Sequence, residues 1–529
     1  MSIEKFQEQQ DGIATRAHHM KSALVVPVID QGTGKFIGDR GARNEKLEGA
    51  VGGTIFESCG KSAPMIIATG SNAVRAFAHQ HGRLPSDDLL AAAFCAIDNA
   101  VRFSTGAAKP SGVFESAVAL NTQDSAQAMM RDRMIALILP VMLQSVTSNI
   151  VGFIPGDFNQ SEIFRVWKIA GTTFGDLTAG QRIDYTFRGQ YGTMDQRFLT
   201  ISGNGIKTGS AAEFDKAVGM PVKKKSIKVL HDRNVVAKDD GQGNLAGSFL
   251  VGVTPVVVTG TVNYTTGLIH PVFSVAPADG IEVHVGADID IEKNPALIPS
   301  VNHEMDSRVL YPHEAAISAS TTLQSLWGLR REFNLNIDNM ATVNMRNLLA
   351  ADKDRKHLRD LYFYAKGSAS WDMAIPQGLS YREHYESIRT KLLEIDASLM
   401  QANGYSGLVG IVADTKSATI LKSLPSPYFE PAPGYVRIPQ PHYVGRLFGM
   451  WDLYEDPQAD DYTSLCFAKG RNITEAAYLS GDAIPAMAFK HALMGDLKYN
   501  NTLWELAYRD LQPFNGRDYI TVLNITNEG

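Results

Sequence analysis

The sequence predicts an α+β protein in which a β-rich region interrupts mainly helical sequence. Apolar residues recur at helical spacing from Leu90 to Val101 and again between residues 130 and 141. Valine and threonine dominate residues 249–285, as is typical of strands, and mixed α/β sequence begins at Leu408. A length of 529 residues with 44% hydrophobic content suits two to four domains with real cores.

Charge and cysteine content exclude several classes of protein. The net charge of −6 argues against a dedicated nucleic-acid-binding protein, which would carry a basic excess. Three widely spaced cysteines (Cys59, Cys95, Cys466) exclude a disulfide framework and a zinc ribbon, and they indicate a reducing compartment. The longest apolar run, Met134–Leu143, is far shorter than the roughly 20 residues of a membrane-spanning helix. The polar first residues lack the apolar core of a secretory signal, so we expect no leader.

The N-terminal third begins without a clear period. Glycines interrupt every apolar run in residues 1–85, which predicts an extended arm more than a domain. Ser86 is a plausible N-cap for the helix that carries the stripe from Leu90 to Val101. In the second helix, Pro140 should kink or end the element.

Residues 150–300 resemble β-structure. Short strand candidates occupy residues 163–169, 182–187 and 198–201. The strongest candidate region, 249–285, has turns at Thr266–Gly267 and Asp279–Gly280. These features predict a small meander or sandwich inserted in a larger fold.

Helical sequence returns after Tyr311. Asp338 can cap a helix that runs to Gly367, but five charges at 352–356 break its apolar stripe. Two shorter helices would explain this pattern, as would one long helix whose polar middle is covered by another chain or by water; we favour the single helix. Ser380 and Glu383 form a capping box for the next helix, which Gly404 closes.

The C-terminal part reads as alternating strands and helices. Leu408–Ala413 is a short buried strand, and Asp414 caps the helix Ser417–Leu424. The further strand candidates are residues 446–454, 463–468 and 519–525.

Patterns that would indicate catalysis are weak. Gly53–Ser62 (GTIFESCGKS) ends like a phosphate-binding loop, but its first glycine stands seven residues before Gly60 instead of five. His303 and His313 have acidic neighbours but lack the H-E-x-x-H spacing of a zinc site. We therefore predict no catalytic, cofactor-binding or metal-ligating residue, and we expect the chain not to be an enzyme.

Charge patterning carries more information. A basic stretch with a net charge of +5 spans Lys223–Lys238, and an acidic stretch with a net charge of −6 spans Asp279–Asp306. Both could be solvated loops, or they could meet across a subunit interface. A second possible partner for the basic stretch is an acidic turn formed by Glu455, Asp456, Asp460 and Asp461. The candidate inter-subunit contacts are Lys223, Lys224, Lys225, Lys228, Arg233, Asp288, Asp290 and Glu292.

Four stretches together resemble a known family. They are VTSNIVGFIPG (Val146–Gly156), Pro312–Ala365, the pair Leu408–Pro425 and Gly445–Pro457, and Asn501–Thr526. Their order and spacing resemble the major capsid protein of tailed bacteriophages, whose fold is named after phage Hong Kong 97, and the contractile-tailed phages are closest in style. No strict motif is involved, and the likeness covers about half of the chain, mainly residues 130–160 and 310–529.

The resemblance implies a domain plan. It implies an N-terminal arm and helices over residues 1–150, then an extended β loop over 151–310 that holds a β-rich insertion at about 210–290. A peripheral domain with a long spine helix would follow over 311–404, an axial domain over 405–500, and closing strands over 501–529.

The resemblance also implies a function. Such a chain assembles with itself into the hexamers and pentamers of an icosahedral head, which encloses double-stranded DNA through weak, non-specific contact. Its place would be the virion capsid, assembled in the host bacterial cytoplasm, with decoration, scaffold, portal or vertex proteins as partners and neither cofactor nor membrane. A β-rich enzyme and a nanocompartment shell protein are the alternatives.

Overall fold

The computed structural model describes residues 3–30, 32, 34–105, 125–173, 178–183, 196–201, 206–208, 211–251, 253–277, 283–293, 297–333, 337–490 and 498–526. It contains both helices and sheets, and the chain divides into two compact units. The main unit combines Met1–Arg165 with Ser307–Gly529, and the inserted unit is Val166–Asp306.

The main unit begins with packed helices where the sequence predicted an arm. The helices are α1 (Ile3–Leu24), α2 (Arg40–Gly49), α3 (Ala63–His81), α4 (Asp87–Thr105) and α6 (Ser125–Gln144), with 3-10 turns η1 (Val26–Val28), η2 (Ile55–Ser62) and η3 (Val146–Asn149). Met20 and Leu24 of α1 are 1% exposed, within the main core. The expectation of an extended arm over 1–85 is therefore wrong.

The glycines explain that error. Gly82 ends α3 in the left-handed conformation, with φ of 66°, so it separates two helices instead of preventing them. Gly70 lies inside α3, where a Cβ would stand 3.3 Å from Leu24, so it allows α1 and α3 to approach closely. Pro140 lies inside α6, which continues to Gln144, so the proline does not end this helix.

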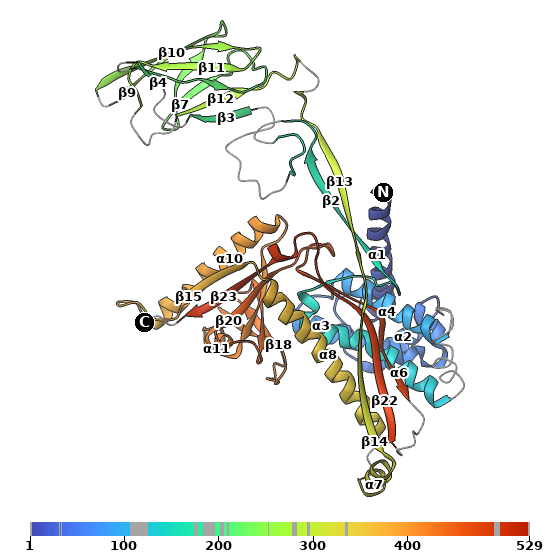
Figure 1. Cartoon of the computed structure of the whole chain (residues 1–529). Coiled ribbons are helices and arrows are strands. Elements are labelled where there is room, and N and C mark those ends of the chain that lie inside the picture. The colour runs from blue at the N-terminus through green and yellow to red at the C-terminus, as the bar shows by residue number, and fades with distance from the viewer. Residues whose placement is uncertain are drawn as a thin grey trace. The chain divides into compact units, whose positions relative to one another are not determined.

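A long helix packs on a four-stranded sheet. The strand order is β1 (Gly152–Phe153), β21 (Tyr478–Lys490), β22 (Lys498–Leu511) and β14 (His313–Thr322). Helix α8 (Ile337–Tyr364, 28 residues) packs against β22 and β14, and α7 (Leu323–Phe333) precedes it (Figure 1). The expectation of one long helix is confirmed, although it ends before Gly367, which begins β15.

The second sheet of the main unit has seven strands. In order they are β15 (Gly367–Asp372), β23 (Ile520–Thr526), β20 (Thr463–Ala468), β16 (Leu408–Asp414), β19 (Trp451–Asp456), β18 (His442–Leu447) and β17 (Phe429–Pro431). Helices α10 (Ile388–Asn403) and α11 (Thr415–Lys422) pack on it, with the short α9 (Tyr381–Glu386) before α10 and the 3-10 turn η5 (Gly516–Tyr519) before β23.

Capping residues in this region correctly predicted where helices begin and end. The capping box of Ser380 and Glu383 and the left-handed Gly404 are confirmed, but the single helix expected between them is divided at Ser387 into α9 and α10. The single strand expected at 446–454 is wrong, because Phe448 and Gly449 turn the chain with positive φ angles of 52° and 68° between β18 and β19.

The inserted unit is a ten-stranded sheet around its own core. Along the sheet the order is β3 (Gln196–Ile201), β12 (Val283–Asp288), β7 (Lys228–His231), β8 (Asn234–Asp239), β9 (Asn244–Val251), β10 (Thr254–Asn263), β11 (Leu268–Phe273), β5 (Ala211–Glu213) and β4 (Ile206–Thr208), and β6 (Lys216–Ala217) pairs with β11. Val285 of β12 and Phe273 of β11 belong to one buried cluster, so the sheet curls around a common core.

The expected turn at Thr266–Gly267 joins β10 to β11, whereas Asp279–Gly280 and most of 182–187 lie outside the described residues. Strands β2 (Ser161–Ala170) and β13 (Val301–Leu310) pair with each other as a separate two-stranded sheet.

Candidate functional site

The strand register places oppositely charged residues on one outward face of the inserted unit. Lys228 of β7 lies opposite Lys238 of β8 on one side and opposite Gly286 of β12 on the other. Directly paired residues share a face of a sheet, and residues two apart on a strand share it too. Asp288 and Asp290 therefore lie on the same face as Lys228, since their neighbour Ile289 points into the core.

A bridge outside the named strands adds one more cation to this face. Val222 pairs with Ile289, and both side chains are buried. The amide of Lys223 donates to the carbonyl of Asp288 at 2.9 Å, and the amide of Asp290 donates to the carbonyl of Pro221 at 2.8 Å. Lys223 follows Val222, so it points outward beside Asp288.

We call this set the charged face, and it consists of Lys223, Lys228, Lys238, Asp288 and Asp290. Its cations and its carboxylates form neighbouring columns, because adjacent strands lie about 4.8 Å apart. The structure thus brings the two predicted stretches together within one chain. Contact of either stretch with a second chain stays a prediction.

The other predicted residues lie around the charged face. Lys224 lies over the Tyr264 ring at 5.7 Å, and the amide of Lys225 donates to Asp239 Oδ2 at 2.7 Å. Arg233 is exposed in the β7–β8 turn with a positive φ of 64°, and Glu292 is exposed after β12.

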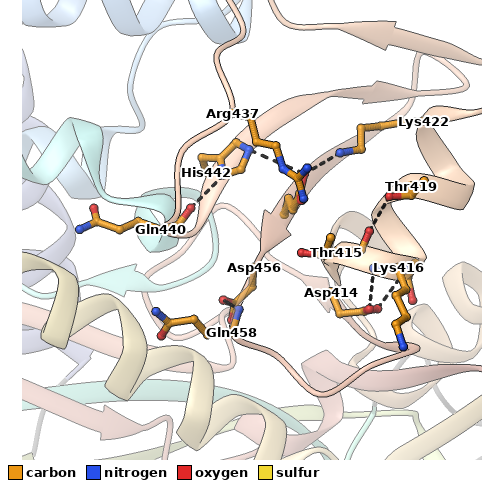
Figure 2. Close-up of polar contacts among 12 residues, drawn as sticks. Asp414, Thr415, Lys416, Thr419, Lys422, Arg437, Gln440, His442, Asp456 and Gln458 are labelled. Atoms are coloured by element: carbon orange, nitrogen blue, oxygen red, sulfur yellow. Dashed lines mark hydrogen bonds and ion pairs between the residues drawn. The ribbon is translucent and has the colours of Figure 1, made fainter.

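A second ionic centre lies in the main unit, and the sequence analysis did not predict that its residues meet. Glu455 of β19 is completely buried, and its carboxylate meets Lys422 Nζ at 2.6 Å and Arg437 Nη2 at 3.2 Å. His442 Nε2 lies 3.8 Å from the same carboxylate. Figure 2 shows Lys422, Arg437 and His442 converging from α11, a loop and β18. We call this cluster the Glu455 centre.

Electrostatics keep Glu455 charged. Burial works against the charge, but Lys422, Arg437 and His442 outweigh it, so the pKa of Glu455 lies below its usual value. Burial raises the pKa of the neighbouring Asp456. The proposed role of Glu455 and Asp456 as an external partner for the basic stretch is wrong, because both side chains are buried. Asp461 is exposed and pairs with Lys416 at 2.6 Å.

The Glu455 centre has a structural role. It ties the end of α11 to β18 and to the proline-rich loop that carries Arg437. That loop holds Val436 and Ile438 exposed at the surface. Sequence spacing gave no signal for this arrangement, because its members come from four separate segments.

A third polar cluster joins α8 to η3. Asp354 accepts hydrogen bonds from Ser145 Oγ at 2.5 Å and from Thr147 Oγ1 at 2.9 Å, and Thr147 Oγ1 also contacts His357 Nδ1 at 3.0 Å. Lys353 pairs with Asp482 beside a cavity of about 60 Å³. Burial raises the pKa of Asp354 and holds the pKa of His357 well below its usual value.

This cluster contains the residue types of a hydrolytic triad in the wrong order. In such a triad the carboxylate orients the imidazole, and the imidazole activates a hydroxyl. Here the carboxylate of Asp354 accepts from the hydroxyls, His357 Nδ1 contacts Thr147 Oγ1, and the His357 ring lies 5.0 Å from the Tyr478 ring. The arrangement therefore joins η3 to α8.

The sequences considered for catalysis form ordinary elements. Ile55–Ser62 is the 3-10 segment η2, His303 lies on β13, and His313 of β14 faces Asp510 at 3.6 Å. Among the residues that the structure describes, no group of three or more histidine, cysteine or acidic side chains could hold a metal ion. None of the described helices is long and apolar enough to cross a membrane.

Comparisons with known proteins identify a family. Residues 1–145 match a family model described as a domain of unknown function (DUF8615). Protein IncB of Escherichia coli is 31% identical over 179 residues, which cover 32% of this chain and 86% of that protein. The chain therefore belongs to the family of protein IncB.

Solved structures with some likeness to this chain include several phage capsids. The capsid of Myoviridae phage XM1 is 11% identical, covers 61% of this chain and 96% of its own, and has a TM-score of 0.31. Mycobacterium phage Che8 is 13% identical, with 56% and 84% covered and a TM-score of 0.30. The capsid of an empty GTA particle is 10% identical, with 43% and 77% covered and a TM-score of 0.27. At TM-scores near 0.3 these likenesses carry no argument about this chain.

Proposed function

We propose that this chain is the major capsid protein of a tailed bacteriophage with the Hong Kong 97 fold. In this proposal it assembles with itself into the hexamers and pentamers of an icosahedral head around double-stranded DNA. The virion is its destination, and the host bacterial cytoplasm is its place of assembly. Decoration, scaffold, portal or vertex proteins are the candidates for further partners.

One observation carries the proposal, namely an exposed two-stranded sheet followed by a long helix. A two-stranded sheet alone is marginally stable in water. Strand β13 nevertheless exposes most of its residues, including Val301 and Val309. A neighbouring subunit that covers this strand would supply the missing burial.

The helix α8 supports the same proposal. Its apolar side chains Val343, Leu348 and Phe363 are more than half exposed, and Phe363 is 82% exposed. Large exposed apolar side chains on one elongated element indicate an interaction surface. The order of elements also follows the plan of the capsid resemblance: helices, a paired extended segment with an inserted unit, a long helix, and a separate sheet.

Charge supports only weak contact with packaged DNA. Non-specific DNA binding depends on clustered lysine and arginine, whereas the net charge of this chain is −6. The basic stretch lies beside an acidic one on the charged face, which suits contact between proteins better than contact with phosphate.

Light scattering over a concentration series tests this proposal. The expected result is a threshold concentration above which purified chains form large, closed particles. A stable monomer under all concentrations, salts and temperatures tried would contradict the proposal.

A further inference from the structure

We propose that the charged face of one subunit docks on the charged face of a second copy, related by a two-fold rotation. In this contact Lys228 and Lys238 of each copy meet Asp288 and Asp290 of the other. The inference rests on the proposed self-assembly and names one of its contacts.

The first argument is the state of these side chains within one chain. Lys228 and Lys238 are directly opposite each other on neighbouring strands, and both are exposed. Like charges in this position disfavour the sheet unless an opposite charge lies over them. Among the described residues neither lysine forms an ion pair and Asp288 forms none, whereas Asp290 has a loose pair with Lys293 Nζ at 3.9 Å. A carboxylate from outside the chain would balance the lysine pair.

The second argument is the order of the columns. The lysines occupy β8 and β7, and the carboxylates occupy β12 and the residues just after it. A two-fold axis that runs obliquely across the strands, through the midpoint between Lys228 and Asp288, exchanges the lysine pair of one copy with the carboxylate pair of the other. Such a contact is isologous, so each copy gives and receives the same interaction.

The third argument is access. Asp288 ends β12, which β7 and β3 hold on both sides, and Asp290 follows it. Both carboxylates stay partly exposed, which allows long lysine side chains from a second copy to reach them.

Mixed-isotope cross-linking tests the contact directly in the full chain. Unlabelled and ¹⁵N-labelled chains are mixed, assembled, and treated with a zero-length carbodiimide, which joins lysine to carboxylate. We expect peptides that join Lys228 or Lys238 of one isotope to Asp288 or Asp290 of the other. If closed particles form but these residues give no cross-link between labelled and unlabelled chains, the inference is overturned. The proposed function would still stand. Failure to form any particle would overturn both.

Charge exchange gives an independent test. The variant K228E/K238E and the variant D288K/D290K should each raise the critical concentration for assembly about tenfold. The variant with all four substitutions should have a critical concentration within about threefold of the parent's. An isologous contact stays complementary when the charges of both columns are exchanged.

A matched control changes the same net charge away from the candidate contacts. The variant K46E/K216E alters one lysine on α2 and one on β6, and it should assemble like the parent. Two results would count against the inference. One is an equal effect of this control, which would indicate a general effect of net charge. The other is a variant with all four substitutions whose critical concentration is as high as that of either double variant. This result would indicate a partner other than a second copy.

Discussion

The Glu455 centre and the charged face use the same residue types in opposite surroundings. In the first, one completely buried carboxylate is satisfied within the chain by Lys422, Arg437 and His442. In the second, lysines and carboxylates stand exposed or half-buried on adjacent strands. A buried charge that loses its partner is costly, whereas exposed pairs contribute little. The comparison indicates that the Glu455 centre stabilises the fold, whereas the charged face is available for contact with other chains.

The largest expected effect comes from breaking the Glu455 centre. Lys422→Met removes the nearest cation and should lower the free energy of unfolding by about 3–5 kcal/mol, because it leaves a buried carboxylate with poorer partners. Urea denaturation of unassembled subunits measures this change. Lys416→Met is the matched control, since Lys416 lies on the same helix and also pairs at 2.6 Å, but with the exposed Asp461. Equal losses in the two variants would contradict the distinction between buried and exposed charge.

Acid should weaken the main unit through His81. This ring is buried between Phe77 and Tyr443, and burial, together with Arg83 and Arg446, lowers its pKa from 6.5 to about 4. The neutral ring is favoured in the folded state, so its contribution is complete above pH 6.5 and is lost as pH falls towards 4. The loss amounts to about 3 kcal/mol over that window.

Unfolding of His81→Phe at pH 7 and pH 5 measures this contribution. The variant should lose less stability between the two values than the parent, while His79→Phe, at an exposed position on the same helix, should behave like the parent. A parent and a His81→Phe variant with the same pH dependence would show that this ring does not titrate as described.

Charge reversal near the charged face should affect assembly more than folding. Changing Lys223, Lys224 and Lys225 together to Glu should raise the critical concentration for assembly roughly tenfold, and added salt should act in the same direction. Light scattering in a salt series measures both effects. If the lysines are only solvated, the triple variant will assemble at the parent's concentration with the parent's salt dependence.

The smallest effect sharpens the same comparison. Lys228→Ala should change the free energy of unfolding of the unassembled subunit by less than about 0.5 kcal/mol, since its side chain is exposed and makes no ion pair among the described residues. Denaturation of parent and variant side by side provides the measurement. A loss of several kcal/mol would mean that the charged face serves the fold.

Elements with strong local signals could be predicted from the sequence. The capping box at Ser380, the N-cap Asp414 and the buried strand before it each depend on residues within a few positions. The helix α8 was also predicted, and it continues through the five charges that break its apolar stripe. Helix α1 was not, because it is polar and contains Gly12, and the burial of Met20 and Leu24 comes from distant helices.

The charged face and the Glu455 centre also differ in how far the sequence predicts them. The basic and acidic stretches were visible as runs, but only the strand register shows that Lys228 and Asp288 share a face. The Glu455 centre could not be predicted, because residues 422, 437, 442 and 455 meet only after the sheet has formed. Predicting it requires the pairing of β18 with β19, which places His442 opposite Glu455.

Electron microscopy of particles assembled from the purified chain tests the central claim most directly. The account predicts closed polyhedral shells whose averaged images show both five-fold and six-fold capsomers. Tubes, twelve-fold rings or unassembled chains under conditions that keep the protein folded would contradict it.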